Sequence, residues 1–332
     1  MRATIKEVAE LAKVSTATVS NVLTGRKPVS DELKDKVNEA IRQLNYKPNF
    51  AARTLKTNQS HLIGVIVPDI MNPFFAEVLS VAAKTASARG FQVLMYSTGE
   101  DAEREKRILK RMEQNGIGGI IDATSRIDTL EFFEQLDMPI VLLDMISNET
   151  AQNVSYVLTD NYASGRVAAE YLVKKGYQKF ACIAGPVETA PAAKNRLTGF
   201  CDELQEHGRC CEGIYECMFS FDDGYQGMES LLAEKKAGEA LAVYACSDIM
   251  AWGAVSYCEK HGLEIPKDVA IIGNDNVWCS SYISKGLTTV VNSAKILGEK
   301  ATNMLLDAIE HEGVFNGQGE VIVPTVCERG TA

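Results

Sequence analysis

The sequence lacks several features that would assign it to a common class of protein. It begins Met-Arg-Ala-Thr-Ile-Lys, without the apolar run of a signal peptide, and no stretch approaches the roughly 20 apolar residues of a membrane-spanning helix. Cysteine is absent from the first 180 residues, and the nine cysteines that follow have no C-x-x-C spacing. The four histidines are isolated from one another. We therefore expect a cytoplasmic protein with reduced thiols, no disulfide framework, no metal and no cofactor.

Motifs of nucleotide-dependent and hydrolytic enzymes are also missing. The stretch G-I-G-G-I-I does not match G-x-G-x-x-G, and G-x-x-x-x-G-K-[ST] does not occur. No Ser-His-Asp or Cys-His set has a supporting turn motif. We therefore predict that the chain is not an enzyme.

Charge is distributed unevenly along the 332 residues. Residues 1–60 contain 11 Lys and Arg against 6 Asp and Glu, a net charge of +5, whereas the remainder carries 23 against 38, a net charge of −15. A basic head on an acidic body is expected when only the head meets a polyanion such as nucleic acid. The length by itself allows two or three domains.

The head contains the start signals of three short helices. Thr4-Ile5-Lys6-Glu7 is a capping box, Ser15 is placed to cap the stretch Thr16–Gly25, and Ser30 precedes a third stretch with helical spacing. The second stretch presents small polar side chains such as Thr16, which let a backbone approach base edges. Two short helices joined by a tight turn are typical of the helix-turn-helix, whose second helix enters the major groove of DNA.

A fourth, shorter helix is predicted after the proline that ends the third. Asn49 would cap residues 50–55, which make barely two turns and are too few to be stable alone in water, so we expect them to order on binding. Arg53 and Lys56 would contact phosphates, and Leu55 would insert between base steps in the minor groove. The residues assigned to DNA contact are Thr4, Ser15, Thr16, Ala17, Thr18, Ser20, Asn21, Asn49, Ala52, Arg53, Leu55 and Lys56.

From Leu62 onward, apolar runs alternate with amphipathic stretches. The runs form one set at residues 62–68, 91–97, 118–123 and 139–144, and a second set at 179–185, 216–219, 240–246 and 269–275. Buried parallel strands separated by helices are typical of the doubly wound α/β fold, in which ligands bind beyond the carboxyl ends of the strands. The sequence therefore predicts two parallel α/β lobes in tandem, with a ligand cleft between them.

Polar and aromatic residues follow many of these runs and form the candidate ligand site. They are Asp69, Phe74, Asp122, Asp144, Arg196, Phe219, Asp248 and Asp275. Facing carboxylates and one arginine would clamp hydroxyl groups, and an aromatic ring would stack on an apolar ligand face. A turn or N-cap role explains each aspartate alone equally well. An acidic lining favours a neutral polyol or a cation over a phosphate.

Three motifs carry a resemblance to the lac and gal repressor family of bacterial transcription regulators. They are T-I-K-E-V-A-E-L-A-K-V-S-x-A-T-V-S-N-V-L, V-S-D-E-L and N-Y-K-P-N-x-A-A-R-T-L, within the first 60 residues, and the likeness continues through the rest of the chain. The resemblance implies a helix-turn-helix head, a hinge helix and an effector-binding core. It implies that this core is similar to type I periplasmic sugar-binding proteins, with two lobes and three crossing segments.

The resemblance also ranks the candidate residues. Arg196, in N-R-L-x-G-F, and Asp275, in G-N-D-N, match motifs that imply effector contact, and Ser247 occupies a further pocket position where an Asn is usual. The pair Asp160 and Asn161 also matches a family motif, but we interpret it as the cap of a helix over residues 162–174 and leave it out of the site.

Several positions at which the sequence departs from or matches the family pattern affect the expected partners, which are DNA, a phosphoprotein and a second copy of the chain. Asn21 stands where many members carry Arg, which changes the base read there. The stretch V-V-N-S-A-K after Thr289 lacks the usual Gln-Pro, which argues against docking of a phosphoprotein. Trp252 falls where the family places its dimer seam, with burial inside the monomer as the alternative. Because no apolar heptads follow V-P-T-V-C-E-R-G-T-A, we expect a homodimer that reads a near-palindromic operator.

These observations predict three parts. Residues 1–47 form a helix-turn-helix domain, 48–60 a hinge helix and linker, and 61–332 the core, with a first lobe of about 61–159 and 290–319 and a second of about 160–289 and 320–332. We predict a transcription repressor whose affinity for operator DNA is controlled by a small polar effector that is a sugar or sugar derivative. The alternative is a cytoplasmic small-molecule sensor, or solute-binding protein, without specific DNA readout.

Overall fold

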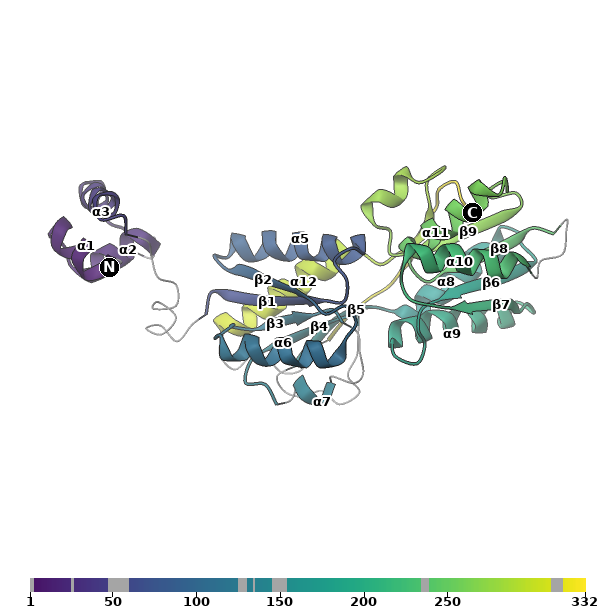
Figure 1. The fold of residues 1–332 in the computed structure, drawn as a ribbon, viewed down its shortest axis with the longest axis horizontal. Helices are drawn as coiled ribbons and strands as arrows, with labels where there is room; N and C mark the ends of the chain where they lie inside the picture. Colours follow the sequence, from purple (N-terminus) through teal and green to yellow (C-terminus); the bar gives the residue numbers. More distant parts are fainter. Residues whose placement is uncertain are drawn as a thin grey trace. The chain divides into compact units, whose positions relative to one another are not determined.

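The computed structural model describes residues 3–24, 27–46, 60–124, 130–133, 135–144, 154–233, 239–311 and 319–332. The chain divides into two compact units, Met1–Gln59 and Ser60–Ala332. Figure 1 shows the first unit as a group of short helices and the second as two lobes of strands covered by helices. In the described part of the chain, no helix is long and apolar enough to cross a membrane.

One small apolar core holds the first unit together. Its helices are α1 (Ile5–Ala12), α2 (Thr16–Thr24) and α3 (Asp31–Gln43). The buried core residues are Val8, Ala9, Ala12, Val19, Val37 and Ala40. Val22 is half-buried and packs against this core, whereas Leu23 is exposed. The inward face of α2 is therefore narrow.

Local hydrogen bonds start the first two helices where the sequence predicts. The Thr4 backbone N–H donates to Glu7 Oε2 at 2.6 Å, and the Glu7 N–H donates to Thr4 Oγ1, which completes the capping box. The Thr18 N–H donates to Ser15 Oγ at 3.1 Å, so Ser15 caps α2. The third helix also begins where predicted, with Ser30 at the N-cap position of α3, but the Ser30 side chain makes no capping hydrogen bond.

The first lobe of the second unit is a parallel six-stranded sheet in the order β11-β5-β4-β3-β1-β2. Its strands are β1 (Leu62–Val67), β2 (Gln92–Ser97), β3 (Ile120–Asp122), β4 (Ile140–Leu143), β5 (Val154–Thr159) and β11 (Gly319–Ile322). Helices α5 (Pro73–Ala88) and α12 (Ala294–Glu310) pack on one face, and α6 (Ala102–Gln114) with α7 (Leu130–Phe133) on the other. Because both faces are covered, the central strands are continuous apolar runs.

The second lobe repeats this plan in the order β12-β10-β9-β8-β6-β7, with only the β10–β12 pair antiparallel among the described strands. Its strands are β6 (Lys179–Ala184), β7 (Cys211–Glu216), β8 (Leu241–Ala245), β9 (Val269–Asn274), β10 (Thr288–Val291) and β12 (Thr325–Cys327). Helices α8 (Asn161–Lys174) and α9 (Pro191–Glu206) cover one face, and α10 (Phe221–Ala233) and α11 (Asp248–Lys260) the other. The short helix η2 (Trp278–Tyr282) follows β9.

The predicted strand at residues 216–219 is wrong. The strand of this region is β7, which ends at Glu216, and the sequence after it leaves the sheet. Because β7 is an edge strand, it alternates exposed and half-buried residues and contains glutamates. The apolar residues that follow it therefore match the pattern of a buried strand better than β7 does. The short strands β5, β10, β11 and β12 were not predicted either.

Three crossing segments join the lobes, and hydrogen bonds join the segments to one another. They run from β5 to α8, from β10 to α12 and from β11 to β12. Thr159 Oγ1 donates to Asn292 Oδ1 at 2.6 Å, which links the first two segments. The Asp160 N–H donates to the Ile322 carbonyl at 2.9 Å, which links the first to the third. The side chain of Asp160 caps α8, as predicted.

The sheet pairing moves two predicted lobe boundaries. Residues 290 and 291 end β10 and belong to the second sheet, and residues 320–322 pair with β5 in the first. Both boundaries fall in short strands whose hydrogen-bonding neighbours are distant in sequence, so local pattern does not show to which sheet they belong.

Two glycines let α8 and α9 pack closely. A Cβ atom at Gly165 would collide with the carbonyl oxygen of Arg196, and one at Gly199 would collide with the carbonyl oxygen of Tyr162. Backbone therefore lies directly against backbone at this crossing, and the approach sets the position of α9 and of Arg196 on it.

We expect Gly199→Ala to lower the free energy of unfolding by about 2 kcal/mol or more, because the added methyl group forces the two helices apart. This loss would occur although alanine is the better helix former by about 1 kcal/mol. Urea unfolding measures it, with Thr198→Ala on the exposed side of the same helix turn as the control, expected within about 0.5 kcal/mol of wild type. A stabilising Gly199→Ala would contradict the packing argument.

Candidate functional site

A cavity lies between the two lobes of the second unit, at the carboxyl ends of their strands. Its lining residues are Pro68, Asp69, Asn72, Phe74, Phe75, Glu100, Ala123, Thr124, Asp144, Pro186, Thr189, Ala190, Ala192, Arg196, Phe219, Ser247, Asp275 and Asn292. Seven of the nine predicted ligand-site residues are among them: Asp69, Phe74, Asp144, Arg196, Phe219, Ser247 and Asp275. The cavity therefore lies where parallel α/β sheets place their ligands.

The guanidinium of Arg196 is buried at the centre of this cavity wall and binds groups from four places in the fold. Its Nη2 lies 2.9 Å from Asp144 Oδ2, at the end of β4 in the first lobe. Its Nε donates to Asn161 Oδ1 at 2.7 Å, and its Nη1 donates to the Cys246 carbonyl at 2.8 Å. Asp275 Oδ1 lies 3.8 Å from Nη1. One side chain thus joins both lobes and the first crossing segment.

Burial and neighbouring charge act in opposite directions on this cluster. Burial works to lower the pKa of Arg196, but the charges of Asp144 and Asp275 outweigh it, so the pKa is raised and the guanidinium stays charged. Burial raises the pKa of Asp275 to about 7, although Arg196 opposes the shift. Asn274 Nδ2 and Asn292 Nδ2 both donate to Asp275 Oδ1. Asp275 therefore titrates near neutral pH in a cavity wall.

Asn161 belongs to this cluster, contrary to the prediction. Its Nδ2 donates to Asp144 Oδ1 at 3.2 Å while its Oδ1 accepts from Arg196 Nε. The amide thereby holds the ion pair of Arg196 and Asp144 from a third side. Only the cap of α8 is visible in the sequence, because the partners of Asn161 are distant along the chain.

Asp248 does not line the cavity, and its predicted role as a ligand contact is contradicted by its bonds. Its Oδ2 accepts from the Val277 N–H at 3.0 Å and from Ser280 Oγ at 2.6 Å, and its Oδ1 accepts from Thr289 Oγ1 at 2.5 Å. Burial raises its pKa. The side chain fastens the start of α11 to the turn after β9, while Ser247, one residue earlier, faces the cavity.

Asp122 is likewise outside the cavity lining. Its Oδ1 accepts from both the backbone N–H and Oγ1 of Thr124, at 2.9 and 2.8 Å. Burial and, second, the charge of Glu105 on α6 raise its pKa well above the usual range. Asp122, the last residue of β3, faces the helix layer. It affects the cavity only by positioning Thr124, which lines the cavity.

Two aromatic rings contribute apolar walls. Phe74 packs edge-to-face on Phe75, with ring centroids 5.2 Å apart, beneath the cap that Asn72 Oδ1 provides for α5. Phe219 lies over the end of β6, where a Cβ at Gly185 would collide with its ring. Rings on opposite lobes therefore face the cavity together with its carboxylates.

Sequence reasoning missed five polar residues of the lining: Asn72, Glu100, Thr124, Thr189 and Asn292. The sequence indicates Asn72 as a helix cap, because it precedes a proline. It also shows Asn292 as the residue after an apolar run. Neither signal shows that the side chain faces the cavity, since that depends on how the lobes meet.

The predicted DNA-contact face of α2 is exposed in the first unit. Thr16, Ala17 and Ser20 are exposed, and Asn21 and Thr18 are partly so, opposite the buried Val19. Thr4 and Ser15 are exposed at the starts of α1 and α2. The other predicted contacts, Asn49, Ala52, Arg53, Leu55 and Lys56, lie outside the described residues.

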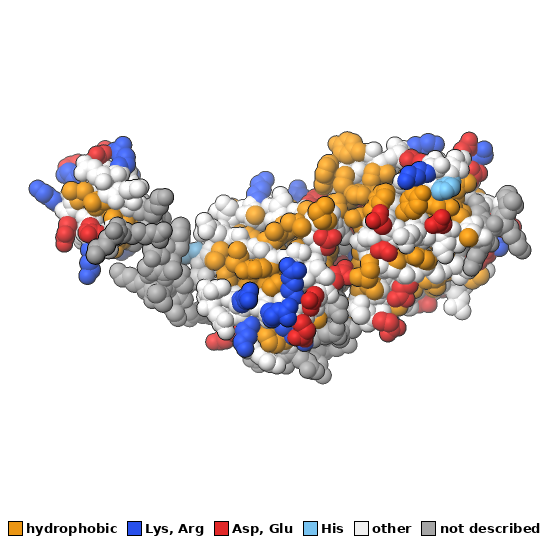
Figure 2. All heavy atoms as spheres, viewed as in Figure 1, with side chains coloured by type: hydrophobic (Ala, Val, Ile, Leu, Met, Phe, Trp, Pro, Cys, Tyr) orange, Lys and Arg blue, Asp and Glu red, His pale blue; other side chains and the backbone are white. Residues whose placement is uncertain are grey.

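Trp252 is half-buried within its own chain. It contacts the apolar clusters of both lobes, and its Nε1 is buried without a hydrogen-bond partner among the described residues. Trp278 and Tyr282 of η2 are instead 66% and 79% exposed. Figure 2 shows hydrophobic side chains gathered over this turn. Contacts within the chain therefore cover part of Trp252, its place at a dimer seam stays a prediction, and η2 adds an exposed apolar surface.

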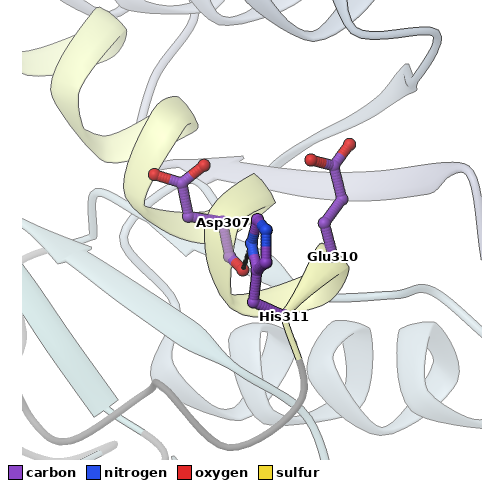
Figure 3. A group of neighbouring side chains, drawn as sticks. All are labelled: Asp307, Glu310 and His311. Carbon is purple, nitrogen blue, oxygen red and sulfur yellow. Dashed lines mark hydrogen bonds between the residues drawn. The ribbon is translucent and has the colours of Figure 1, made fainter.

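Asp307, Glu310 and His311 lie close enough together at the end of α12 to suggest a metal site (Figure 3). All three are exposed, and His311 Nδ1 is 3.2 Å from the Asp307 carbonyl. Arg89 Nη2 already lies 2.7 Å from Asp307 Oδ1 and 2.5 Å from Glu310 Oε2. Because the Arg89 guanidinium already pairs with both carboxylates, we interpret the group as an ion-pair network rather than a cation site.

Both units match known family models. Residues 4–49 match the model for bacterial regulatory proteins of the lacI family. Residues 60–323 match the model for periplasmic binding proteins and the sugar binding domain of the LacI family.

Known proteins are similar over most or all of the chain. The ribose operon repressor of Halalkalibacterium halodurans is 36% identical over 99% of this chain and 97% of its own. The transcriptional repressor PurR of Mannheimia succiniciproducens is 34% identical over 93% of each. The lac repressor dimer bound to operator and the anti-inducer ONPF has a TM-score of 0.86 at 25% identity, over 100% of this chain and 99% of that one. A ribose-bound regulator from Enterococcus faecium has a TM-score of 0.71 at 25% identity, over 82% and 98%.

The raised pKa of Asp275 predicts a pH-dependent stability. Because its folded-state pKa of about 7 exceeds the ordinary value of 3.8, its contribution is full below the ordinary value and is lost as the pH rises to about 7. Between pH 4.5 and 7.5 we expect the free energy of unfolding of the wild type to fall by up to about 3 kcal/mol more than that of Asp275→Asn. Urea unfolding across this range measures it. Asp222→Asn, at an exposed position, should keep the wild-type profile, and parallel curves for wild type and Asp275→Asn would refute the assignment.

Proposed function

Because this chain belongs to the LacI family of bacterial regulatory proteins, we propose that it is a transcription repressor whose operator affinity is set by a small polar effector in the interlobe cavity. The observation that carries the effector site is the buried cluster of Arg196, Asp144, Asn161 and Asp275, which draws on both lobes. The helix-turn-helix unit favours this function over a sensor without DNA readout. The relatives are repressors, and the proposal assigns no catalytic activity to the chain.

The chemistry of the lining supports a neutral, sugar-like effector. The described cavity lining contains four carboxylates, on Asp69, Glu100, Asp144 and Asp275, and one cation, the guanidinium of Arg196. A phosphate bound there would therefore meet excess negative charge. Carboxylates accept hydrogen bonds from hydroxyl groups, and the rings of Phe74 and Phe219 suit the apolar face of a sugar ring. A ribose operon repressor and a ribose-bound family structure are among the similar proteins, which makes ribose the first compound to test.

The crossing segments supply a route from the effector to the DNA. Asn292 bonds Asp275 in the cavity and Thr159 on another crossing segment, so a change in the cavity acts directly on the hinge between lobes. An effector acts through its preference for one lobe arrangement, and a coupling of about 5- to 150-fold in operator affinity is typical.

In this proposal the DNA contacts come from two places. Thr16, Ala17, Ser20 and Asn21 of α2 would meet base edges in the major groove, with Thr4, Ser15 and Thr18 near phosphates. Residues 49–56 would form the hinge helix, with Asn49, Ala52, Arg53 and Lys56 along the backbone and Leu55 in the minor groove. Two copies would read a near-palindromic site as a homodimer, for which the exposed Trp278 and Tyr282 are a better surface than Trp252.

We expect Arg196→Met to weaken ribose binding by about 10- to 100-fold, because hydrogen bonds to a charged group are lost from the cavity wall. Isothermal titration calorimetry measures the affinity, with Lys267→Met, which removes an exposed ion pair with Glu264, as the control expected to bind as wild type. Circular dichroism and Arg196→Lys, which keeps the charge but not the fork of donors, separate misfolding from lost contacts. Wild-type affinity in Arg196→Met would remove Arg196 from the site, and binding of a purine base in place of every sugar tested would refute the sugar assignment.

A footprint on fragments of the source genome tests the DNA-binding assignment. We expect a near-palindromic protected site whose affinity falls steeply as salt rises, because phosphate contacts release counterions. Ala17→Glu, on the exposed face of α2, should weaken it by about 100-fold or more, since the new carboxylate faces the groove. Asn38→Glu places the same charge on an exposed position of α3 and should stay within about 3-fold of wild type. Diffuse binding that Ala17→Glu leaves unchanged would favour the sensor.

A further inference from the structure

Three polar side chains form a hydrogen-bonded chain behind the cavity wall of the second lobe. The hydroxyl of Tyr244, on β8, donates to Asn274 Oδ1 at 3.0 Å. Asn274 ends β9, and its Nδ2 donates to Asp275 Oδ1 at 3.2 Å. Tyr244 and Asn274 are fully buried, and Asp275 is 6% exposed. The chain therefore leads from the interior of the sheet to a carboxylate that lines the cavity.

The two carboxylate oxygens of Asp275 have different surroundings. Oδ1 accepts from Asn274 Nδ2 and from Asn292 Nδ2, and it lies 3.8 Å from Arg196 Nη1. No hydrogen bond from the described residues reaches Oδ2. Because the side chain is more than nine-tenths buried and lines the cavity, Oδ2 is an acceptor that a molecule in the cavity has to satisfy.

The backbone that carries this carboxylate is strained. Asp275 has a φ of 132° and Asn276 a φ of 55°, both in the region that favours glycine. The Asp275 N–H donates to the Val290 carbonyl at 2.9 Å. The Asn276 N–H donates to Thr289 Oγ1 at 3.3 Å, and its side chain accepts from Arg329 Nη2 at 2.7 Å. Strain of this kind persists where the surrounding structure enforces it, as in ligand clamps. The fold therefore holds Asp275 in the cavity wall against its local backbone preference.

Tyr244 determines which way the amide of Asn274 points. Burial raises the pKa of Tyr244 well above its usual range, so the hydroxyl keeps its proton and needs an acceptor. In the observed orientation Asn274 Oδ1 is that acceptor, and Nδ2 faces Asp275. If the amide turned over, the phenolic proton would lose this acceptor and the amide oxygen would face the carboxylate. The hydroxyl therefore excludes the orientation in which Asn274 could accept a proton from Asp275.

We propose that Tyr244 is a positioning residue for the effector: through Asn274 it keeps Asp275 Oδ1 bonded within the protein and presents Oδ2 to the cavity as the acceptor for an effector hydroxyl. This inference rests on the effector site proposed above and adds to it a residue that does not line the cavity. An effector without a donor at this point leaves the buried Oδ2 unpaired, so the site selects for a hydroxyl there.

The pH dependence of unfolding tests the amide orientation without any effector. The charged and titratable groups that face Asp275 are Arg196 of α9, Asp144 beyond β4, Asp248 of α11 and Tyr244 of β8. In Tyr244→Phe the freed amide can turn over and accept a proton from Asp275. We expect the pKa of Asp275 to rise above its value of about 7, its acid dissociation constant falling by about 3- to 10-fold. In urea unfolding, the loss of stability with rising pH should therefore continue to a higher pH than in the wild type.

Three further variants make this measurement specific. Asp275→Asn removes the titrating group, so Tyr244→Phe should not shift the profile in that background. Tyr171→Phe is the matched control, because it removes a hydroxyl that donates to the Ala332 carbonyl at 2.9 Å in the same lobe, and it should keep the wild-type profile. If Tyr244→Phe does not fold, adding Asn274→Leu removes the stranded amide as well and should show the same shift. An unchanged profile in whichever of these variants folds would overturn the proposal.

Calorimetry with ribose separates this inference from the proposed function. We expect Tyr244→Phe to weaken ribose binding by about 10-fold, because Asp275 is no longer fixed as an acceptor, and Tyr171→Phe to bind as wild type. Undiminished affinity in Tyr244→Phe would refute the positioning role and leave the effector site in place. If the wild type bound no ribose and the pH profile still shifted, the choice of sugar would fail and the fixed orientation of Asp275 would stand.

Discussion

A charge buried in a protein needs partners inside it, and the guanidinium of Arg196 is the charge on which the second unit depends. Its side chain is only 5% exposed, so each donor that lacks a protein acceptor would cost desolvation energy. The acceptors come from the end of β4, the start of α8 and the end of β8, with Asp275 beyond β9. Satisfying one side chain therefore brings the first lobe, the second lobe and a crossing segment to one point.

The position of the Arg196 side chain depends on the backbone packing of the helix that carries it. Gly165 and Gly199 let α8 and α9 approach until backbone meets backbone, which brings Asn161 of one helix to Arg196 of the other. On the other side, Asn292 joins Asp275 to Thr159, so the same polar cluster extends into the segments about which the lobes would move. A ligand that replaces or strengthens one of these bonds acts on the hinge without an intermediate element.

The aspartates at the strand ends show how residues with one sequence signature take different roles. Asp144 and Asp275 face the cavity, whereas Asp122 supports Thr124 and Asp248 ties α11 to the turn after β9. The sequence places all four after apolar runs. Side chains alternate between the faces of a strand, so a shift of one residue decides whether a carboxylate meets the ligand space or a helix.

The sequence alone determined the features that depend on neighbouring residues. The capping box at Thr4 and Glu7, the cap at Ser15, the exposed face of α2 and the central strands of both sheets follow from spacing and local hydrogen bonding, and the motifs identified the family. Only the tertiary structure decided that Asn161 and Asn292 join the cavity, that Asp122 and Asp248 leave it, that Trp252 packs on the apolar clusters of both lobes, and that residues 320–322 pair with the first sheet. The physical reason is that these contacts join segments tens to more than a hundred residues apart, whose meeting is set by sheet order and helix packing rather than by any local pattern.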